Sequence, residues 1–212
     1  MMEPWEYLGV YLIAGTQDVA DGNLPQLLEQ ALLAGVTCFQ YREKGLGSLQ
    51  QKEQREATAR ACQKLCRKYK IPFIINDDVE LALAIGADGI HVGQEDQHIE
   101  EVLRLFADRI VGLSCYDEKE ITEANQLTAI SYYGIGPVFG TISKADAKPP
   151  IGVKKLGELA VLAEKPSVAI GGISTINIGE IKKTTVAGSA VISAVTQSDD
   201  INETIKKIKM GG

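Results

Sequence analysis

The sequence predicts an α/β protein with the fold of a (β/α)₈ barrel, or TIM barrel, on three observations. Short apolar runs alternate with helical patterns along the whole chain, and eight of these runs resemble strands. The runs show little alternation between apolar and polar residues, which is typical of parallel strands covered on both faces. The competing fold, a doubly wound open sheet, usually has a GxGxxG loop after its first strand, and Ala14-Gly15-Thr16-Gln17-Asp18 lacks one.

The predicted strands share short length and an apolar, often β-branched composition. In chain order they cover residues 10–14, 37–41, 73–76, 89–92, 110–113, 133–135, 168–170 and 190–192.

The predicted helices are recognised by their apolar periodicity and by their end signals. The first ends at Gly35, a favourable residue for a helix end, and the second ends before Ile71-Pro72, where proline prevents continuation. Asp78, Asp117 and Ser174 are candidate N-caps. The helices are expected at residues 24–34, 48–69, 79–85, 99–106, 118–127, 153–163, 175–183 and 201–210.

Composition indicates one globular domain spanning residues 1–212, with 45% hydrophobic and 24% charged residues. The net charge of −6 argues against nucleic acid as a partner. We expect no membrane span and no signal peptide, hence a cytoplasmic protein, and a homo-oligomer is compatible with the sequence. The four cysteines lack metal-site spacing and are expected to be free thiols.

Polar side chains gather where the predicted strands end, which in a barrel is the active-site face. Gln40, Arg42 and Lys44 are spaced by two, so an extended segment would point all three to the same side. Asn76-Asp77-Asp78 follows the third strand and Gln94-Glu95-Asp96 the fourth. Carboxylates from adjacent loops can meet, and two of them with phosphate oxygens and water would suit Mg²⁺. Helix capping is the alternative for Asp78.

The later loops carry groups suited to phosphate. Residues 137–150 form one long irregular stretch with Thr141, Ser143 and Lys144, which could clamp an anion or form an ordinary solvated loop. Gly171-Gly172 follows the seventh strand and Ser193 the eighth, the positions that bind phosphate in many barrels, although the glycines could simply turn the chain. His91 is expected to be structural or to support a site residue, and His98 to lie solvated at a helix start.

These residues together resemble the thiamine phosphate synthase family. The matching motifs occur in order over nearly the whole chain, and they are Phe39-Gln40-Tyr41-Arg42-Glu43-Lys44, Ile75-Asn76-Asp77, Gly89-Ile90-His91-Val92-Gly93-Gln94-Glu95-Asp96, Gly136-Pro137-Val138-Phe139, Ala147-Lys148-Pro149-Pro150-Ile151-Gly152, Ile170-Gly171-Gly172-Ile173 and Val191-Ile192-Ser193-Ala194. The resemblance implies a (β/α)₈ barrel that condenses hydroxymethylpyrimidine diphosphate with hydroxyethylthiazole phosphate, giving thiamine monophosphate and pyrophosphate.

The resemblance also implies roles for individual residues. Asp77 and Asp96 would bind Mg²⁺, and Gln40 would orient the pyrimidine. Ser114 would stand near the pyrimidine, and with Arg42 and Lys144 it is an expected catalytic residue. The residues expected to hold diphosphate oxygens are Arg42, Lys44, Asn76 and Lys144. Those expected to hold the thiazole phosphate are Thr141, Ser143, Gly172, Ile192 and Ser193.

Two positions depart from the family pattern. Ser143 stands where the family usually has threonine, which preserves the hydroxyl group. Tyr116 stands where histidine is common, which disfavours an alternative function, the thiazole tautomerase, whose catalysis resembles use of that histidine. A non-catalytic phosphate-ligand sensor is a further alternative. Cys115 lacks a histidine nearby in the sequence that would activate it as a nucleophile.

Overall fold

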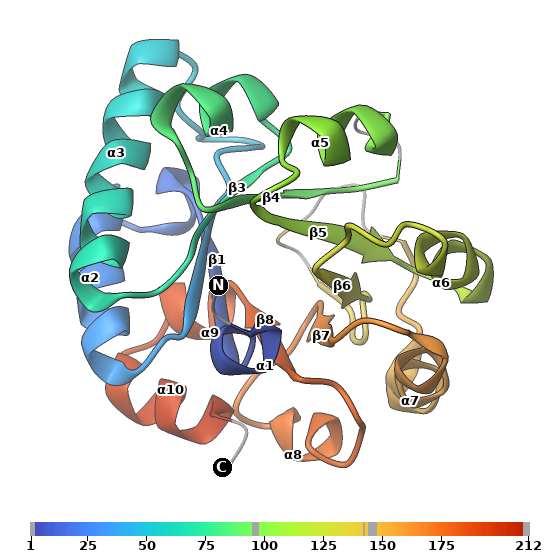
Figure 1. Cartoon of the computed structure of the whole chain (residues 1–212). Coiled ribbons are helices and arrows are strands. Elements are labelled where there is room, and N and C mark those ends of the chain that lie inside the picture. The colour runs from blue at the N-terminus through green and yellow to red at the C-terminus, as the bar shows by residue number, and fades with distance from the viewer. Residues whose placement is uncertain (1–2, 95–97, 142, 144–147, 210–212) are drawn as a thin grey trace.

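A closed barrel of eight parallel strands forms the centre of the described part of the chain, in the order β1 to β8 (Figure 1). The structure is a computed structural model and describes residues 3–94, 98–141, 143 and 148–209. The strands are β1 (Val10–Ala14), β2 (Cys38–Tyr41), β3 (Phe73–Asn76), β4 (Gly89–Val92), β5 (Ile110–Cys115), β6 (Tyr132–Ile135), β7 (Ser167–Ile170) and β8 (Gly188–Val191). The predicted fold class is confirmed.

Each strand sends alternate side chains to opposite faces, and this divides the core in two. Leu12, Phe39 and Ile75 belong to the larger apolar cluster, which lies between the barrel and the helices. Tyr11 and Cys38, one position away along their strands, belong to the smaller cluster inside the barrel. The register pairs Tyr11 with Cys38 and Leu12 with Phe39, so neighbouring strands keep the two faces in step.

Helices surround the barrel and cover the outer apolar cluster (Figure 1). Their bounds are α1 (Pro4–Tyr7), α2 (Leu24–Ala34), α3 (Lys52–Tyr69), α4 (Val79–Ile85), α5 (Ile99–Leu105), α6 (Glu118–Asn125), α7 (Gly152–Leu162), α8 (Ile178–Ile181), α9 (Ser193–Thr196) and α10 (Ile201–Ile208), with a 3₁₀ turn at Thr16–Asp18. None of the helices within these described residues is long and apolar enough to cross a lipid bilayer.

Two helices, α3 and α8, begin several residues later than their apolar patterns predict. The residues before α3 are held in a loop, because Glu43 accepts a hydrogen bond from the backbone N–H of Leu49 (2.8 Å) and the Ser48 hydroxyl donates to the Gly45 carbonyl (2.7 Å). Before α8, the Asn177 side chain accepts from the backbone N–H of Ser174 (2.8 Å), so Asn177 rather than Ser174 is the N-cap. Local side-chain hydrogen bonds compete with the helix at both places.

The predicted caps Asp78 and Asp117 are confirmed, since each accepts a hydrogen bond of 2.9 Å from the backbone N–H three residues on. The short helices α1 and α9 were not predicted.

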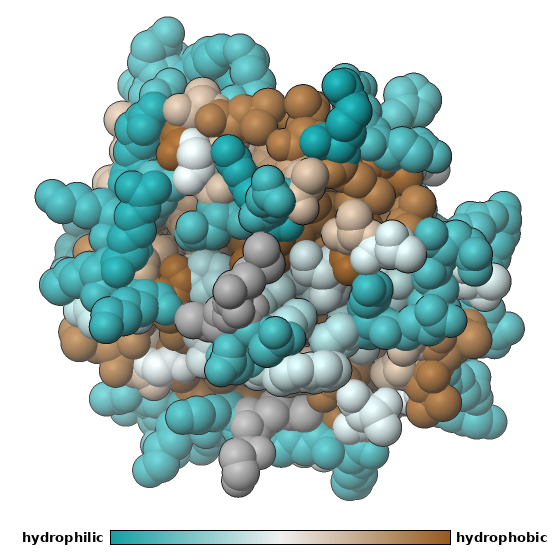
Figure 2. Space-filling view, in the orientation of Figure 1, coloured by the Kyte–Doolittle hydropathy of each residue, from teal (hydrophilic) through white to brown (hydrophobic). Residues whose placement is uncertain are grey.

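The short helix α1 covers the amino-terminal end of the barrel. Tyr7 and Leu8 are buried in the interior cluster, and the ring of Tyr7 meets that of Tyr132 edge-on, with centroids 6.4 Å apart. Figure 1 views the molecule from this end, with α1 in front of the strands. On the same face, hydrophilic residues form most of the rim, with apolar surface in patches between them (Figure 2). The interior of the barrel is therefore closed at this end by α1.

Candidate active site

The loops after β2 and β3 meet at the carboxyl end of the barrel through an ion pair. The Lys44 ammonium donates to a carboxylate oxygen of Asp77 over 2.8 Å. Both side chains reach solvent, with 49% of Lys44 and 23% of Asp77 exposed. A cation and an anion thus stand side by side at an accessible position, where either can bind a ligand of opposite charge.

The two neighbouring aspartates have different tasks. Asp78 caps α4 and lies 3.6 Å from the Arg55 guanidinium, so its carboxylate serves the scaffold. Asp77 has a backbone φ of 58°, in the left-handed region, and its backbone N–H donates to the carbonyl of His91 on β4 (2.9 Å). Strained backbone of this kind is concentrated at functional sites. Capping therefore accounts for Asp78 and leaves the Asp77 carboxylate for another role.

A cavity of about 260 Å³ opens beside this pair. The lining residues come from the ends of β2 and β3, the loops that follow them, and the first turns of α3 and α4, and they are Tyr41, Glu43, Lys44, Arg55, Ile75, Asn76, Asp77, Asp78 and Leu81.

The donor chemistry at the cavity fits a hard divalent cation, because the Asp77 carboxylate is an oxygen ligand that is not used for capping. Asp96, the second expected ligand, lies outside the described residues, which hold no cluster of three or more His, Cys, Asp or Glu suited to a metal.

The other groups expected after β2 lie at the same end of the barrel. One guanidinium nitrogen of Arg42 lies 3.4 Å from the Lys44 carbonyl oxygen, and the Arg42 carbonyl accepts from the Gln17 amide (2.8 Å). Gln40 points into the barrel, is only 2% exposed, and donates to the hydroxyl of Tyr11 (2.9 Å). Asn76 ends β3, opposite His91 in the register. Gln40 therefore lies inside the barrel, whereas Arg42 and Lys44 lie in the loop that follows β2 at the carboxyl end.

Ser114 lies near the end of β5 and has a histidine neighbour. Its hydroxyl is 2.9 Å from Nε2 of His91, and its carbonyl accepts from the Gln94 amide (2.7 Å). His91 is 9% exposed and lies inside the barrel, which agrees with the supporting role expected from the sequence. His98 precedes α5 and is exposed, as predicted.

The loops after β6 and β7 pack tightly against each other. The backbone N–H groups of Val138 and Phe139 donate to the carbonyls of Ile170 (2.8 Å) and Gly171 (3.0 Å). Gly172 has a φ of 62°, and a β-carbon there would overlap the Gly140 carbonyl oxygen. A glycine is therefore required where these loops meet.

Thr141 and Ser143, whose hydroxyls are expected to bind phosphate, follow Gly140 closely in the sequence. Thr141 accepts a hydrogen bond from the backbone N–H of Ser143 (3.2 Å), whereas Lys144 lies outside the described residues. Ser193 begins α9 and Ile192 precedes it.

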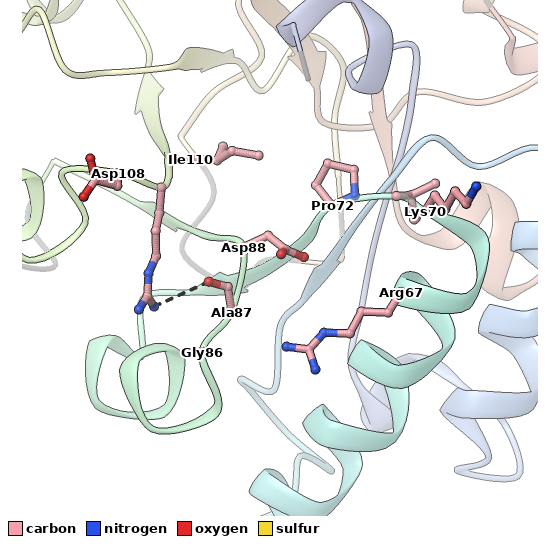
Figure 3. Close-up of a pocket in the computed structure, with 10 residues that line it drawn as sticks. Arg67, Lys70, Pro72, Gly86, Ala87, Asp88, Asp108 and Ile110 are labelled. Atoms are coloured by element: carbon pink, nitrogen blue, oxygen red, sulfur yellow. Dashed lines mark hydrogen bonds between the residues drawn. The ribbon is translucent and has the colours of Figure 1, made fainter. Parts of the chain in front are cut away.

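A larger hollow of about 620 Å³ lies at the opposite, amino-terminal end of the barrel (Figure 3). Its charged side chains are spread around the hollow rather than converging on one point. The Asp88 carboxylate accepts a hydrogen bond from the backbone N–H of Phe73 (2.9 Å), and the Arg109 guanidinium donates to the Ala87 carbonyl (3.5 Å). Both side chains therefore stabilise the backbone of the barrel. Barrel enzymes place their chemistry at the carboxyl end, and we therefore assign the site to the smaller cavity.

The four cysteines are buried free thiols. Burial raises the pKa of Cys115 to about 12, so this thiol stays protonated at neutral pH. The structure supports the view that Cys115 is not a nucleophile.

Reasoning from the sequence did not single out two tyrosines inside the barrel, Tyr11 and Tyr132. Their hydroxyls lie 2.6 Å apart, and Tyr132 also contacts Nδ1 of His91 (2.9 Å). Each sits in or beside an apolar run and looked like an ordinary core residue. The sequence signal that could have identified Tyr11 is the alternation of side chains along a strand. It puts Tyr11 on the same face of β1 as the residue two positions further on.

Comparison with known proteins assigns the chain to a family. A family model described as thiamine monophosphate synthase matches residues 10–195. A protein from Listeria monocytogenes named thiamine-phosphate synthase is 53% identical over 207 residues, which cover 97% of each chain. Another of that name from Latilactobacillus sakei is 48% identical over 95% of this chain and 90% of its own.

The fold agrees with these matches. The solved structure of thiamine phosphate pyrophosphorylase from Pyrococcus furiosus is 32% identical, covers 96% of this chain and 95% of its own, and superposes with a TM-score of 0.85. The expectation drawn from the motifs is confirmed: this chain belongs to the thiamine monophosphate synthase family.

Proposed function

We propose that this protein is a transferase that joins hydroxymethylpyrimidine diphosphate to hydroxyethylthiazole phosphate, forming thiamine monophosphate and releasing pyrophosphate. Family membership over nearly the full chain supports this reaction. The observation that carries this proposal is the Lys44–Asp77 ion pair, which puts a cation and a carboxylate together at the carboxyl end of the barrel.

One bond breaks and one forms in this reaction. The bond between the pyrimidine methylene carbon and the diphosphate oxygen breaks, and pyrophosphate leaves with the electron pair. The electron-rich aminopyrimidine stabilises the cation that remains, and the thiazole nitrogen lone pair then forms the new carbon–nitrogen bond. No strong protein base is needed, so catalysis depends on stabilising the leaving anion.

Cationic and amide side chains in and near the smaller cavity, at the carboxyl end of the barrel, would hold the diphosphate. Lys44, Arg42 and Asn76 lie at the ends of β2 and β3, and Lys144 would approach from the loop after β6. Asp77, together with Asp96, would hold Mg²⁺, which when bound supplies positive charge that neutralises the leaving group. Lys44 already faces Asp77, so the lysine can shift its hydrogen bonds from the carboxylate to phosphate oxygens when substrate and metal arrive.

The remaining residues would orient the two organic rings. Gln40 and Ser114 line the top of the barrel interior and would contact the pyrimidine. Thr141 and Ser143 would bind the thiazole phosphate together with backbone N–H groups at Gly172, Ile192 and Ser193. The close packing of the β6 and β7 loops supports the part of this second site at Gly172, because it gives the backbone there a fixed geometry.

The decisive experiment supplies the two substrates with and without Mg²⁺ and measures thiamine monophosphate and pyrophosphate. We expect equimolar products that require both substrates and the metal. Turnover of the thiazole compound without the pyrimidine diphosphate would favour a tautomerase. Tight binding of thiamine monophosphate without any turnover would favour a sensor. We also infer a reducing compartment such as the cytoplasm, which the four free thiols support.

A further inference from the structure

Five polar side chains form a continuous chain of hydrogen bonds through the barrel interior. It begins at Gln40, whose amide nitrogen donates to the Tyr11 hydroxyl (2.9 Å). The Tyr11 and Tyr132 hydroxyls are 2.6 Å apart, and Tyr132 is 2.9 Å from Nδ1 of His91. Nε2 of His91 completes the chain at the Ser114 hydroxyl, again 2.9 Å away. This chain of five side chains, which we call the relay, thus connects Gln40 and Ser114, the two residues that the proposed function places at the pyrimidine.

The relay is sealed from water along its first three members, from Gln40 to Tyr132. Tyr132 is fully buried, Tyr11 is 1% exposed and Gln40 is 2% exposed. Burial raises the pKa of both tyrosines well above the ordinary value, so each keeps its proton at neutral pH. Each hydroxyl therefore has one proton to donate and must also accept. In a buried network every member needs its partners, because an unsatisfied polar group is costly there.

A glycine makes room for the relay. Gly112 on β5 pairs with His91 on one side and Tyr132 on the other. A β-carbon at this position would overlap both the Tyr132 ring and Nδ1 of His91. The His91–Tyr132 contact therefore exists only because residue 112 has no side chain, which shows that the relay is built into the strand pattern.

The donors and acceptors of the relay run in one direction. The Gln40 amide nitrogen donates to Tyr11, so the Tyr11 proton is free to go to Tyr132 and the Tyr132 proton to Nδ1 of His91. A neutral imidazole that accepts at Nδ1 donates from Nε2, here to the Ser114 oxygen. The Ser114 oxygen then accepts within the protein, and its own proton is left to donate into the site.

We propose that Tyr132 and His91 are positioning residues: Tyr132 holds His91 as the Nε2–H tautomer, and His91 in turn directs the Ser114 hydroxyl proton towards the substrate. The catalytic part of this inference rests on the proposed function, since it assigns Ser114 to the pyrimidine. The tautomer itself is a property of the free protein and can be measured without substrate.

Nitrogen NMR of protein labelled with ¹⁵N-histidine tests the tautomer directly. The chain has two histidines, and a His98→Gln variant identifies the His91 signals, because His98 is exposed and outside the relay. We expect His91 to carry its proton on Nε2. The Tyr132→Phe variant removes the donor to Nδ1, and we expect a mixture of tautomers. Wild-type His91 protonated on Nδ1, or on both nitrogens, would overturn the proposal.

The Tyr7→Phe variant is the matched control. It also removes one hydroxyl from the interior cluster, and its ring touches Tyr132, but its hydroxyl has no described bond to the relay. We expect this variant to keep the wild-type tautomer and the wild-type kcat. A tautomer change in both variants would mean that the interior packing, rather than the relay, sets the histidine.

Kinetics test whether the relay acts through Ser114. We expect Tyr132→Phe to lower kcat about tenfold, the usual effect of one hydrogen bond, with little change in the KM of the pyrimidine substrate. Ser114→Ala should then cost much less in the Tyr132→Phe background than in the wild type. Fully additive losses would refute the proposal. A wild-type protein without synthase activity would refute the proposed function instead, and the tautomer measurement would still stand.

Discussion

Two residues at opposite ends of β3 share an unusual backbone conformation. Lys70 lies just before the strand, at the amino-terminal end of the barrel, and Asp77 lies just after it, at the carboxyl end. Both have a φ of 58°, and among the described residues they are the only non-glycine ones with positive φ. For an ordinary side chain this conformation costs about 1–2 kcal/mol.

The reasons for the two conformations differ. Lys70 ends α3, and the N–H of Ile71 donates to the Cys66 carbonyl (3.1 Å) in the arrangement that commonly closes a helix. Asp77 ends no helix, and its carboxylate faces Lys44 across the loops. The comparison teaches that the strain at one end of the strand serves the scaffold, while the strain at the other end presents the carboxylate that we propose binds Mg²⁺.

Glycine substitution at Asp77 should separate activity from stability most clearly. Asp77→Gly removes the carboxylate and relieves the strain, so we expect kcat to fall by about 10²–10³-fold, as for loss of a group that stabilises developing charge. The free energy of unfolding in urea should stay equal to that of the wild type or rise slightly. A stable variant with unchanged pyrophosphate release would show that Asp77 has no catalytic role.

Lys44 and Lys70, one at each end of the barrel, extend the comparison to the effect of removing a positive charge. Lys44→Met removes a cation from the proposed diphosphate site, and kcat/KM for the pyrimidine substrate should fall about 10- to 100-fold. Lys70→Met removes a cation from the hollow at the amino-terminal end and should leave kcat/KM unchanged. Steady-state kinetics of both variants make the comparison, and equal losses would contradict our assignment of the two ends.

Two glycines with nearly equal φ test the role of close packing. Gly172 (62°) lies under the loop after β6, and Gly86 (61°) ends α4 with open space around it. Gly86→Ala should cost only backbone strain, about 1 kcal/mol of unfolding free energy. Gly172→Ala should cost about 1–3 kcal/mol more because the loops must separate, and should raise the KM of the thiazole phosphate. An unchanged KM would argue against a phosphate site there.

Most of the fold was predictable because a short apolar run in the sequence indicates each strand of this barrel. Apolar strands and helix-end signals recur in order, so the strand at 73–76 and the helix at 24–34 agree with the sequence prediction in their bounds. The start of α3 was not predictable, because the Glu43 carboxylate that holds Leu49 in a loop is six residues away and its direction depends on the folded strand end. Local patterns do not encode such contacts.

The positions of several candidate site residues were predictable, but the contacts between them were less so. The spacing of Gln40 and Lys44 put both at the carboxyl end, and Asp77 joins them there. The tyrosine contacts were not predictable, because Tyr11 and Tyr132 are 121 positions apart and meet only after the barrel closes. Asp96 and Lys144 lie outside the described residues, so their roles stay predictions.

The smallest expected effect concerns stability at the amino-terminal end. Lys70→Gly relieves the left-handed strain at the end of α3, offset in part by the greater flexibility of glycine in the unfolded chain, so the net gain should be at most about 1 kcal/mol. Urea unfolding measures the change, and catalytic activity should be unaffected. A loss of stability would mean that the Lys70 side chain contributes more than its conformation costs.

Calorimetric titration of magnesium pyrophosphate into the wild type, Asp77→Gly and Lys70→Gly tests the central claim most directly. The claim is that the carboxyl end of β3, and not its amino-terminal end, binds the leaving group with its metal. We predict one site in the wild type and in Lys70→Gly, with binding at least about 100-fold weaker in Asp77→Gly. Equal affinity in all three proteins would contradict the claim.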